Sequence, residues 1–126
     1  MSGASLNQIE LDAVIASYTA MGFEVVRASE TCLLLDIDSD FALAQYDRVM
    51  PLVAEHFGAW EAGRWPSKSG NTHIRVELAM AQPWAVRYAL EAMLGSDGMR
   101  GTLGILQMMN GCDEASMLVK PLQVAA

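Results

Sequence analysis

Residues 33–40 read LLLDIDSD, a hydrophobic segment that runs directly into acidic residues. Side chains alternate between the two faces of a β-strand, so this segment predicts a strand with two unlike faces. One face carries Leu33, Leu35 and Ile37, and the other carries Leu34, Asp36 and Asp38. Two neighbouring carboxylates repel each other and raise each other's pKa unless a cation lies between them. The stretch therefore predicts either a solvated strand end or a metal site.

The composition predicts one globular domain over residues 1–126, with 52% hydrophobic and 18% charged residues. No apolar run approaches the roughly 20 residues that cross a bilayer. The first residues, MSGASLNQIE, lack the basic region of a secretory signal. Cys32 and Cys112 match no zinc spacing and are expected to be reduced thiols. We therefore expect a cytoplasmic protein without a membrane partner.

The chain is acidic, with 8 basic and 15 acidic residues and a net charge of −7. Proteins that bind nucleic acid without regard to sequence rely on Lys and Arg to displace counterions from phosphates. The charge therefore argues against broad binding to duplexes. It is compatible with a metal site, with a small nucleotide ligand or with a basic partner protein.

Hydrophobic periodicity predicts helices and strands in mixed order. The expected helices are 7–21, 41–57, 83–95 and 98–109, and the expected strands are 23–28, 31–38, 60–65, 73–78 and 117–120. A tight turn at Ser29 and Glu30 should join the first two strands. Pro51 is expected to kink or split the helix that contains it.

Hairpins and intervening helices, without repeated β-α-β units, are typical of an α+β domain. Its sheet is expected to be mainly antiparallel, with helices packed on one face and the other face partly open. On strand 73–78, alternation directs Ile74, Val76 and Leu78 into the core. The residues expected on the open face are Asp36, Asp38, His73, Arg75 and Glu77.

These polar residues suit the binding of a metal and of phosphate groups. Mg²⁺ and Mn²⁺ prefer oxygen ligands, and Mg²⁺ often takes one or two carboxylates and completes its shell with water and phosphates. The loop SKSGNTH offers hydroxyl, ammonium and backbone donors for phosphate oxygens. The loop donors are Ser67, Lys68, Ser69 and Gly70, and His73 and Arg75 follow on the next strand. A metal with a phosphate clamp is what nucleotidyl transfer requires.

LLLDID and SKSGNTHIRVEL resemble the first two motifs of the archaeo-eukaryotic primase-like superfamily. GSDGMRGTLGIL further resembles small stand-alone proteins of tailed bacteriophages, and the resemblance spans residues 23–119. It implies an RRM-like, primase-like core in which Asp36 and Asp38 bind Mg²⁺ or Mn²⁺. It also implies that His73 contacts the phosphates of a nucleotide. The residues of the implied nucleotide loop are Ser67, Ser69 and Gly70.

The third motif of that family is an acidic residue on a later strand, and its position here stays open. Asp97 is the candidate metal ligand, but Gly-Ser-Asp before a helix is also the pattern of a helix N-cap. Glu77 is directed to the same face but lies on the His73 strand. Zinc and helicase motifs of larger primases are absent from the sequence.

Each feature also has a structural interpretation. The acidic pair could be a strand end followed by a helix N-cap at Ser39 or Asp40. The SKSGN segment could be an ordinary polar hairpin loop, and His73 could be a packed strand residue. Arg100 could reach a phosphate or lie in solvent, and Trp65 could stack on a base or pack against the core.

Two kinds of function follow. The first is a phage-type domain that binds a divalent metal with a nucleotide or single-stranded nucleic acid, with nucleotidyltransferase activity in DNA replication as its fullest form. The second is a non-catalytic accessory or host-defence inhibitor protein that binds a protein of the infected bacterial host. With either function, the sequence leaves open whether the chain forms a homodimer. The nine methionines are expected to fill the core. Several exposed methionines would instead indicate an adaptable protein-binding surface.

Overall fold

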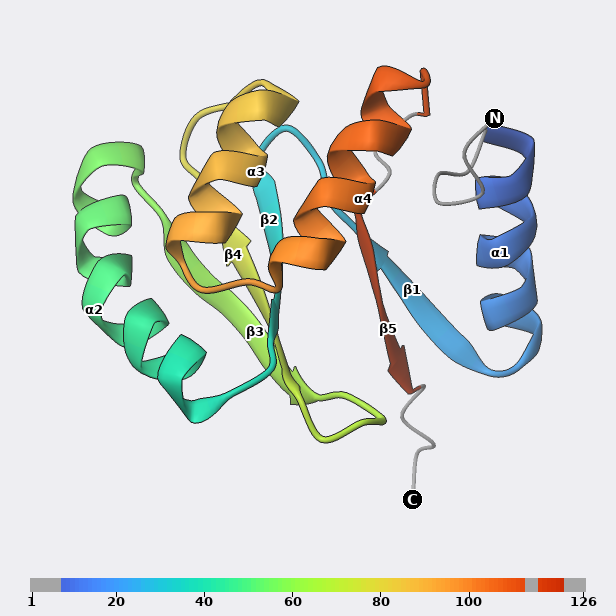
Figure 1. Ribbon diagram of the computed structural model, residues 1–126, viewed down its shortest axis with the longest axis horizontal. Coiled ribbons are helices and arrows are strands. Elements are labelled where there is room, and N and C mark those ends of the chain that lie inside the picture. Colours follow the sequence, from blue (N-terminus) through green and yellow to red (C-terminus); the bar gives the residue numbers. More distant parts are fainter. Residues whose placement is uncertain (1–7, 113–115, 122–126) are drawn as a thin grey trace.

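Helices and strands occur in mixed order in the computed structural model, which describes residues 8–112 and 116–121 (Figure 1). The helices are α1 (Gln8–Ala20), α2 (Asp40–Phe57), α3 (Trp84–Met93) and α4 (Gly98–Met109). The strands are β1 (Phe23–Arg27), β2 (Cys32–Ile37), β3 (Trp60–Pro66), β4 (Thr72–Glu77) and β5 (Met117–Pro121). The predicted helices and strands are confirmed, with small shifts at their ends. The predicted α+β class with antiparallel sheets is confirmed as well.

The larger sheet has the strand order β2-β4-β3, and both of its pairings are antiparallel. Leu33, Leu35 and Ile37 project from one face of β2 and are at most 2% exposed. On the same face of β4, Ile74 and Val76 are fully buried. Side chains of α2 and α3 complete this core, in which each fully buried leucine contributes roughly 1.5–3 kcal/mol to folding.

Helix α2 begins and ends at residues that the sequence indicates. The Ser39 side chain accepts a hydrogen bond from the Ala42 amide at 3.1 Å, and Gly58 ends the helix with a φ of 62°. Of the expected kink or split at Pro51, the split does not occur, because α2 continues through it. Pro51 is exposed, so its ring meets solvent rather than the core.

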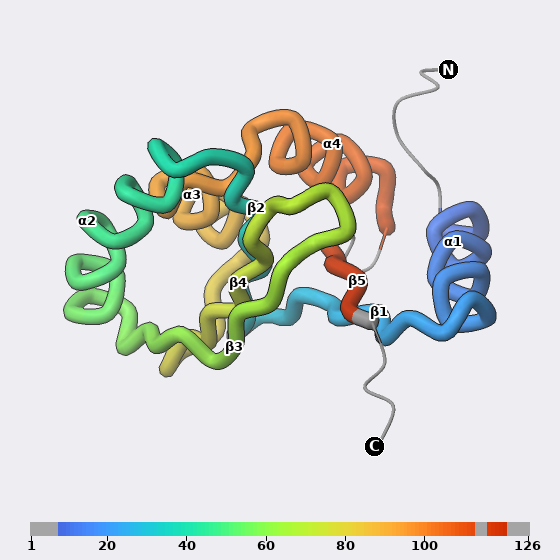
Figure 2. The backbone as a smooth tube through the Cα atoms, turned by 90° about the horizontal axis from the view of Figure 1, so that it is seen from below, coloured from blue at the N-terminus to red at the C-terminus, as the bar shows by residue number. Residues whose placement is uncertain are grey.

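The smaller sheet pairs β1 with β5, and α1 packs beside β1. The expected hairpin of β1 with β2 is therefore wrong, although the short connection between them is present. A single bridge between Ser29 and Cys32 is what remains of that pairing among the described residues. Figures 1 and 2 show α1 and α2 at opposite ends of the molecule, with the strands between them.

The outer edge of β2 is occupied by α3, α4 and the turn that joins them. The backbone N–H groups of Leu34 and Asp36 donate to the Glu91 carboxylate and the Ser96 hydroxyl, each at 3.1 Å. The Leu34 carbonyl accepts from Arg100 at 3.1 Å, and the Asp36 carbonyl accepts from the Asp97 amide at 3.0 Å. Because these groups satisfy the free edge, no strand is needed there, and β1 pairs with β5 instead.

The second face of the larger sheet is less open than expected. Leu34 is fully buried there with Ala28, Cys32 and Leu118, and Trp65 packs against this cluster. The two sheets therefore share a second, smaller core.

Cys32 and Cys112 are both buried and are not joined in a disulfide. Burial raises the pKa of the Cys32 thiol to about 11, which keeps it protonated.

The expectation that methionines fill the core is wrong for most of those described. Five are more than half exposed: Met21, Met80, Met93, Met99 and Met109. Met50, Met108 and Met117 are half-buried at the edges of the cores. In residues 8–112 and 116–121, no helix combines the length and apolarity needed to span a bilayer.

Candidate functional site

Asp36 and His73 face each other across the pairing of β2 and β4. The carboxylate Oδ1 of Asp36 lies 3.5 Å from Nε2 of His73. Opposed residues on antiparallel strands project from the same face, so this contact follows from the strand register. The structure therefore brings together the first acidic residue of the predicted site and its histidine.

His73 is largely enclosed, with 7% of the residue exposed. Its ring meets the Trp65 ring edge-on, with 5.8 Å between centroids. Burial lowers the pKa of His73, and the neighbouring Asp36 carboxylate opposes that shift. Nδ1 is buried, and no described residue shares a hydrogen bond with it. A neutral imidazole that contacts Asp36 through Nε2 is the state that this environment favours.

The hairpin loop between β3 and β4 is closed by its own hydrogen bonds. The Ser67 amide donates to the Asn71 carbonyl at 2.8 Å, and the Ser67 hydroxyl accepts from the Asn71 amide at 2.9 Å. Ser69 is bonded to Ser67 through their hydroxyls, and Gly70 adopts a φ of 87°. The side-chain amide of Asn71 donates to Oδ1 of Asp36 at 3.4 Å. This link between the loop and the acidic residue was missed in the sequence, where Asn71 reads as a plain turn residue.

The two basic residues predicted for the site, Lys68 and Arg75, contact different parts of the protein. Lys68 places its ammonium 4.0 Å from the centre of the Phe23 ring on β1. Arg75 is paired with Glu77 at 2.7 Å, and both lie on the His73 face of β4. The Arg75 charge is thus partly offset by a carboxylate, whereas Lys68 contacts an aromatic ring.

Asp38 is not brought into the same hollow as Asp36. Strand β2 ends at Ile37, so Asp38 lies in the turn toward α2, where strand alternation no longer fixes its direction. It is exposed and lines a shallow hollow of about 280 Å³ with Gly70 and Thr72. Asp36 instead lines a separate groove, with residues of α4 and β5.

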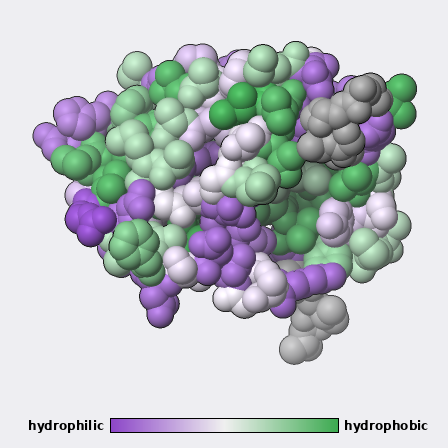
Figure 3. Space-filling view, in the orientation of Figure 1, coloured by the Kyte–Doolittle hydropathy of each residue, from purple (hydrophilic) through white to green (hydrophobic). Residues whose placement is uncertain are grey.

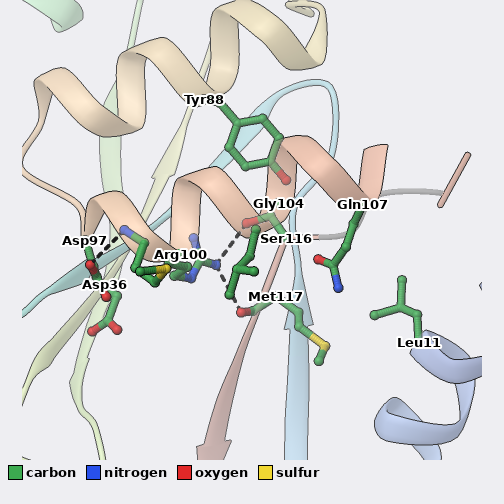
Figure 4. Close-up of a pocket in the computed structure, with 11 residues that line it drawn as sticks. Leu11, Asp36, Tyr88, Asp97, Arg100, Gly104, Gln107, Ser116 and Met117 are labelled. Atoms are coloured by element: carbon green, nitrogen blue, oxygen red, sulfur yellow. Dashed lines mark hydrogen bonds between the residues drawn. The ribbon is translucent and has the colours of Figure 1, made fainter. Parts of the chain in front are cut away.

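That groove lies between α4, β5, α1 and the end of β2, and has a volume of about 320 Å³. Figure 4 shows Asp36 and Asp97 together at one end, with Gln107 and Leu11 toward the other. In Figure 3 the surface is hollowed between α4 and α1, and hydrophobic residues form most of the hollow. The apolar lining residues are Leu11, Met99, Leu103 and Met117. The groove thus combines a carboxylate end with an apolar body.

Asp97 is the N-cap of α4, which is one of the two roles that the sequence indicated for it. Its carboxylate accepts from the Met99 amide at 3.1 Å and caps α4. It also lines the groove beside Asp36, so the two carboxylates do share one wall.

The interpretation of Arg100 as a residue that lies in solvent is wrong. Its side chain is 18% exposed, and it donates to Leu34, Ser116 and Met117 across the two sheets. Nη1 and Nη2 thus donate to the protein, and the side chain also lines the groove beside Asp36, so its contact with a phosphate stays a prediction.

The described residues form no group of three or more Asp, Glu, His or Cys side chains arranged to hold a metal ion. The expected ligand set of Asp36, Asp38 and Asp97 is therefore not assembled in one place. Asp36 still has coordinating capacity, because its contacts to Asn71 and His73 are long and both involve Oδ1. A cation at Asp36 would need further oxygen ligands from a phosphate-bearing molecule and from water.

Comparison of the chain with protein-family models, with curated proteins and with solved structures found no match. The groove, the Asp36–His73 pair and the adjoining hairpin loop therefore define the candidate site by their chemistry alone.

Proposed function

We propose that this chain is a primase-like domain that binds a nucleoside triphosphate together with Mg²⁺ or Mn²⁺. The observation that carries the proposal is the 3.5 Å contact between Asp36 and His73 beside the hairpin loop. The motifs that hold these residues occur in the order found in the primase-like superfamily. An acidic residue on β2 meets a histidine on β4 and the Ser/Gly loop that directly precedes it, although Asp36 is distant from both in sequence.

In this proposal Asp36 is the group that faces the ligand. It lines the groove, whereas His73 is enclosed between Asp36 and Trp65. His73 therefore acts as a positioning residue that orients the Asp36 carboxylate. Asn71 does the same from the loop side through its 3.4 Å hydrogen bond.

The metal ion, when bound, neutralises phosphate charge and aligns the phosphates. Because Asp36 offers the ion only one carboxylate, the other oxygen ligands must come from the triphosphate and from water. Metal and nucleotide are thus expected to bind together rather than separately. The apolar body of the groove accepts the nucleoside, and its volume is within the range of ligand pockets.

The test is thermal unfolding with Mn²⁺ alone, ATP alone and both together. A ligand present at 100 times its Kd adds about 2.7 kcal/mol to the free energy of unfolding. We expect a rise in Tm with both ligands and little rise with either alone. Asp36→Asn should remove the effect, and Asp38→Asn should reduce it less, because Asp38 lines a different hollow.

Asp47→Asn is the matched control, since it removes one exposed carboxylate from α2. It should leave the ligand-dependent rise in Tm unchanged. The proposal is wrong if no nucleoside triphosphate with Mn²⁺ or Mg²⁺ stabilises the wild-type protein.

A second candidate function, binding of a host protein, is favoured by exposed hydrophobic side chains. Phe41 and Leu52 on α2 are 79% and 56% exposed, and their spacing of about three turns places them on one side of the helix. Trp60 and Met80 are also more than half exposed. Adaptable apolar groups on an acidic protein suit a partner with a basic rim.

Its test is capture of a stoichiometric bacterial protein by the wild type and by Phe41→Asp with Leu52→Asp. Loss of a captured protein in the variant, with an unchanged ATP–Mn²⁺ effect, would support this second function. Capture that is identical in both would contradict it.

A further inference from the structure

Helices α3 and α4 are in close contact at one end and separated at the other. At Gly104, an added Cβ atom would lie 2.5 Å from the Tyr88 hydroxyl, so only glycine permits this approach. At Gly101 and Gly98, about one and two turns nearer the start of α4, an added Cβ atom would meet nothing within 4 Å. The helices therefore diverge, and a cavity of about 140 Å³ lies between them.

A buried carboxylate lines this cavity. Glu91 on α3 is 3% exposed, and its Oε2 accepts from the Leu34 amide at 3.1 Å. Its Oε1 is buried, and no described residue donates a hydrogen bond to it. Arg100 is 3.8 Å from Oε1, beyond hydrogen-bonding distance, and already donates to three other acceptors. An unsatisfied buried oxygen of this kind costs about 1–3 kcal/mol.

The rest of the lining is rich in acceptor oxygen. Asp97, Ser96 and Thr102 contribute a carboxylate and two hydroxyl groups, and no Lys, Arg or His lines the cavity within the described chain. Its apolar walls come from Tyr88, Ala92 and Ile105. A cavity of this size holds one small ring, since about 150 Å³ accepts benzene. The complementary ligand is thus small and planar, and carries N–H donors with positive charge.

We propose that the cavity between α3 and α4 binds a free small amidinium or guanidinium compound, whose N–H groups donate to Oε1 of Glu91. The separation of the helices at Gly98 and Gly101 provides the space, and Asp97 adds a second negative charge. This site lies on the opposite side of α4 from the groove that carries Asp36, and the two share Tyr88 and Asp97 in their linings. Glu91 and Gly101, which the proposal uses, line the cavity and not the groove.

Benzamidine is the probe, and benzyl alcohol is its neutral counterpart of similar size. Isothermal titration calorimetry with the full chain should show saturable binding of benzamidine and clearly weaker binding of benzyl alcohol. Glu91→Gln keeps an acceptor for the Leu34 amide and should weaken benzamidine binding roughly tenfold, because the charged partner is lost. Gly101→Leu should abolish binding by filling the cavity.

Gly101→Ala is the control for Gly101→Leu, because it adds one methyl group at the same position and leaves most of the cavity open. The ligand's preference for the ionised carboxylate also gives a pH signature. Burial raises the pKa of Glu91 to about 7, and the charges around it are Arg87, Arg100 and Asp97. Neither arginine loses its proton near neutrality. Benzamidine affinity should therefore rise between about pH 6 and about pH 8 in the wild type and not in Glu91→Gln.

Three results would overturn the proposal: no saturable binding of benzamidine at millimolar concentration, equal affinity for benzamidine and benzyl alcohol, or unchanged affinity in Gly101→Leu. Circular dichroism of each variant confirms that it is folded. If Gly101→Leu fails to fold, Gly98→Leu tests the same cavity wall from a position that is exposed.

Discussion

Arg100 on α4 donates a hydrogen bond from Nη1 to the carbonyl oxygen of Leu34 on β2, at 3.1 Å. The same guanidinium donates to Ser116 and Met117, so one side chain joins the larger sheet to the first residue of β5 in the smaller sheet. Arginine suits this role because its fork of donors reaches several acceptors in one plane.

Removing that guanidinium should destabilise the protein strongly. Arg100→Met keeps most of the apolar stem but removes the donor to the Leu34 carbonyl and the positive charge 3.8 Å from the buried Glu91 carboxylate. We expect a loss of about 3 kcal/mol in the free energy of unfolding, measured by urea denaturation. Arg48→Met on the exposed side of α2 should change it by less than about 0.5 kcal/mol. Equal effects of the two substitutions would contradict the role of Arg100.

Two glycines on α4 should respond oppositely to alanine. Gly104→Ala places a methyl group within 2.7 Å of three Tyr88 atoms and should cost about 1–3 kcal/mol through overpacking. Gly101→Ala meets no atom within 4 Å and should stabilise the protein by roughly 0.5–1 kcal/mol through helix propensity. Thermal unfolding of both variants measures the difference. A destabilising Gly101→Ala would show that α3 and α4 are in contact where the structure separates them.

The stability of the protein should depend on pH through Glu91. Its pKa rises on folding from its usual 4.5 to about 7, chiefly because of burial. The folded state therefore holds a proton that the unfolded state releases above pH 4.5. This contribution is complete below the unfolded value and is lost as pH rises toward 7, by at most about 1.4 kcal/mol per pH unit.

His73 contributes with the opposite sign, because burial lowers its pKa below 6.5. Its contribution is present above the unfolded value and is lost as pH falls. Comparing the wild type with Glu91→Gln separates the two groups. The difference in the free energy of unfolding between these proteins should change steadily between about pH 5 and about pH 7. A constant difference across that window would contradict the burial of Glu91.

Asn71 should matter for the ligand more than for the fold. Asn71→Ala removes the 3.4 Å hydrogen bond that links the hairpin loop to Asp36 but leaves the backbone bonds that close the loop. We expect the Kd for ATP with Mn²⁺ to rise several-fold, on the order of one hydrogen bond, with little change in Tm. Asp47→Asn on the exposed side of α2 is the control and should leave the Kd nearly unchanged. An unaffected Kd in Asn71→Ala would remove Asn71 from the site.

Local patterns predicted the helices and strands of this chain well, while strand pairing and buried charge required the structure. Alternation in LLLDI placed Leu33, Leu35 and Ile37 in the core correctly. The false hairpin of β1 with β2 arose because a short connection between strands usually indicates pairing. The groups that occupy the edge of β2 in place of β1 lie more than 50 residues further along the chain. One example is Glu91, which accepts from the Leu34 amide.

The candidate site was predictable to the same extent. Strand alternation was enough to place Asp36 with His73, because each lies inside its strand. It failed for Asp38, which lies beyond the last paired residue of β2. Arg87 and Glu91 resemble an exposed ion pair one turn apart on α3, and nothing in the sequence showed that both are buried.

Paramagnetic broadening by Mn²⁺ tests the central claim most directly, because the chain has two histidines that report on different places. His73 contacts Asp36, whereas His56 is exposed in the last turn of α2, about 24 Å of helix from Asp40. With ATP in excess over Mn²⁺, we predict that the imidazole resonances of His73 broaden and those of His56 persist. Asp36→Asn should restore the His73 resonances. Sharp His73 resonances in the wild type at saturating ATP and Mn²⁺, or equal broadening of both histidines, would contradict a metal–nucleotide site at Asp36.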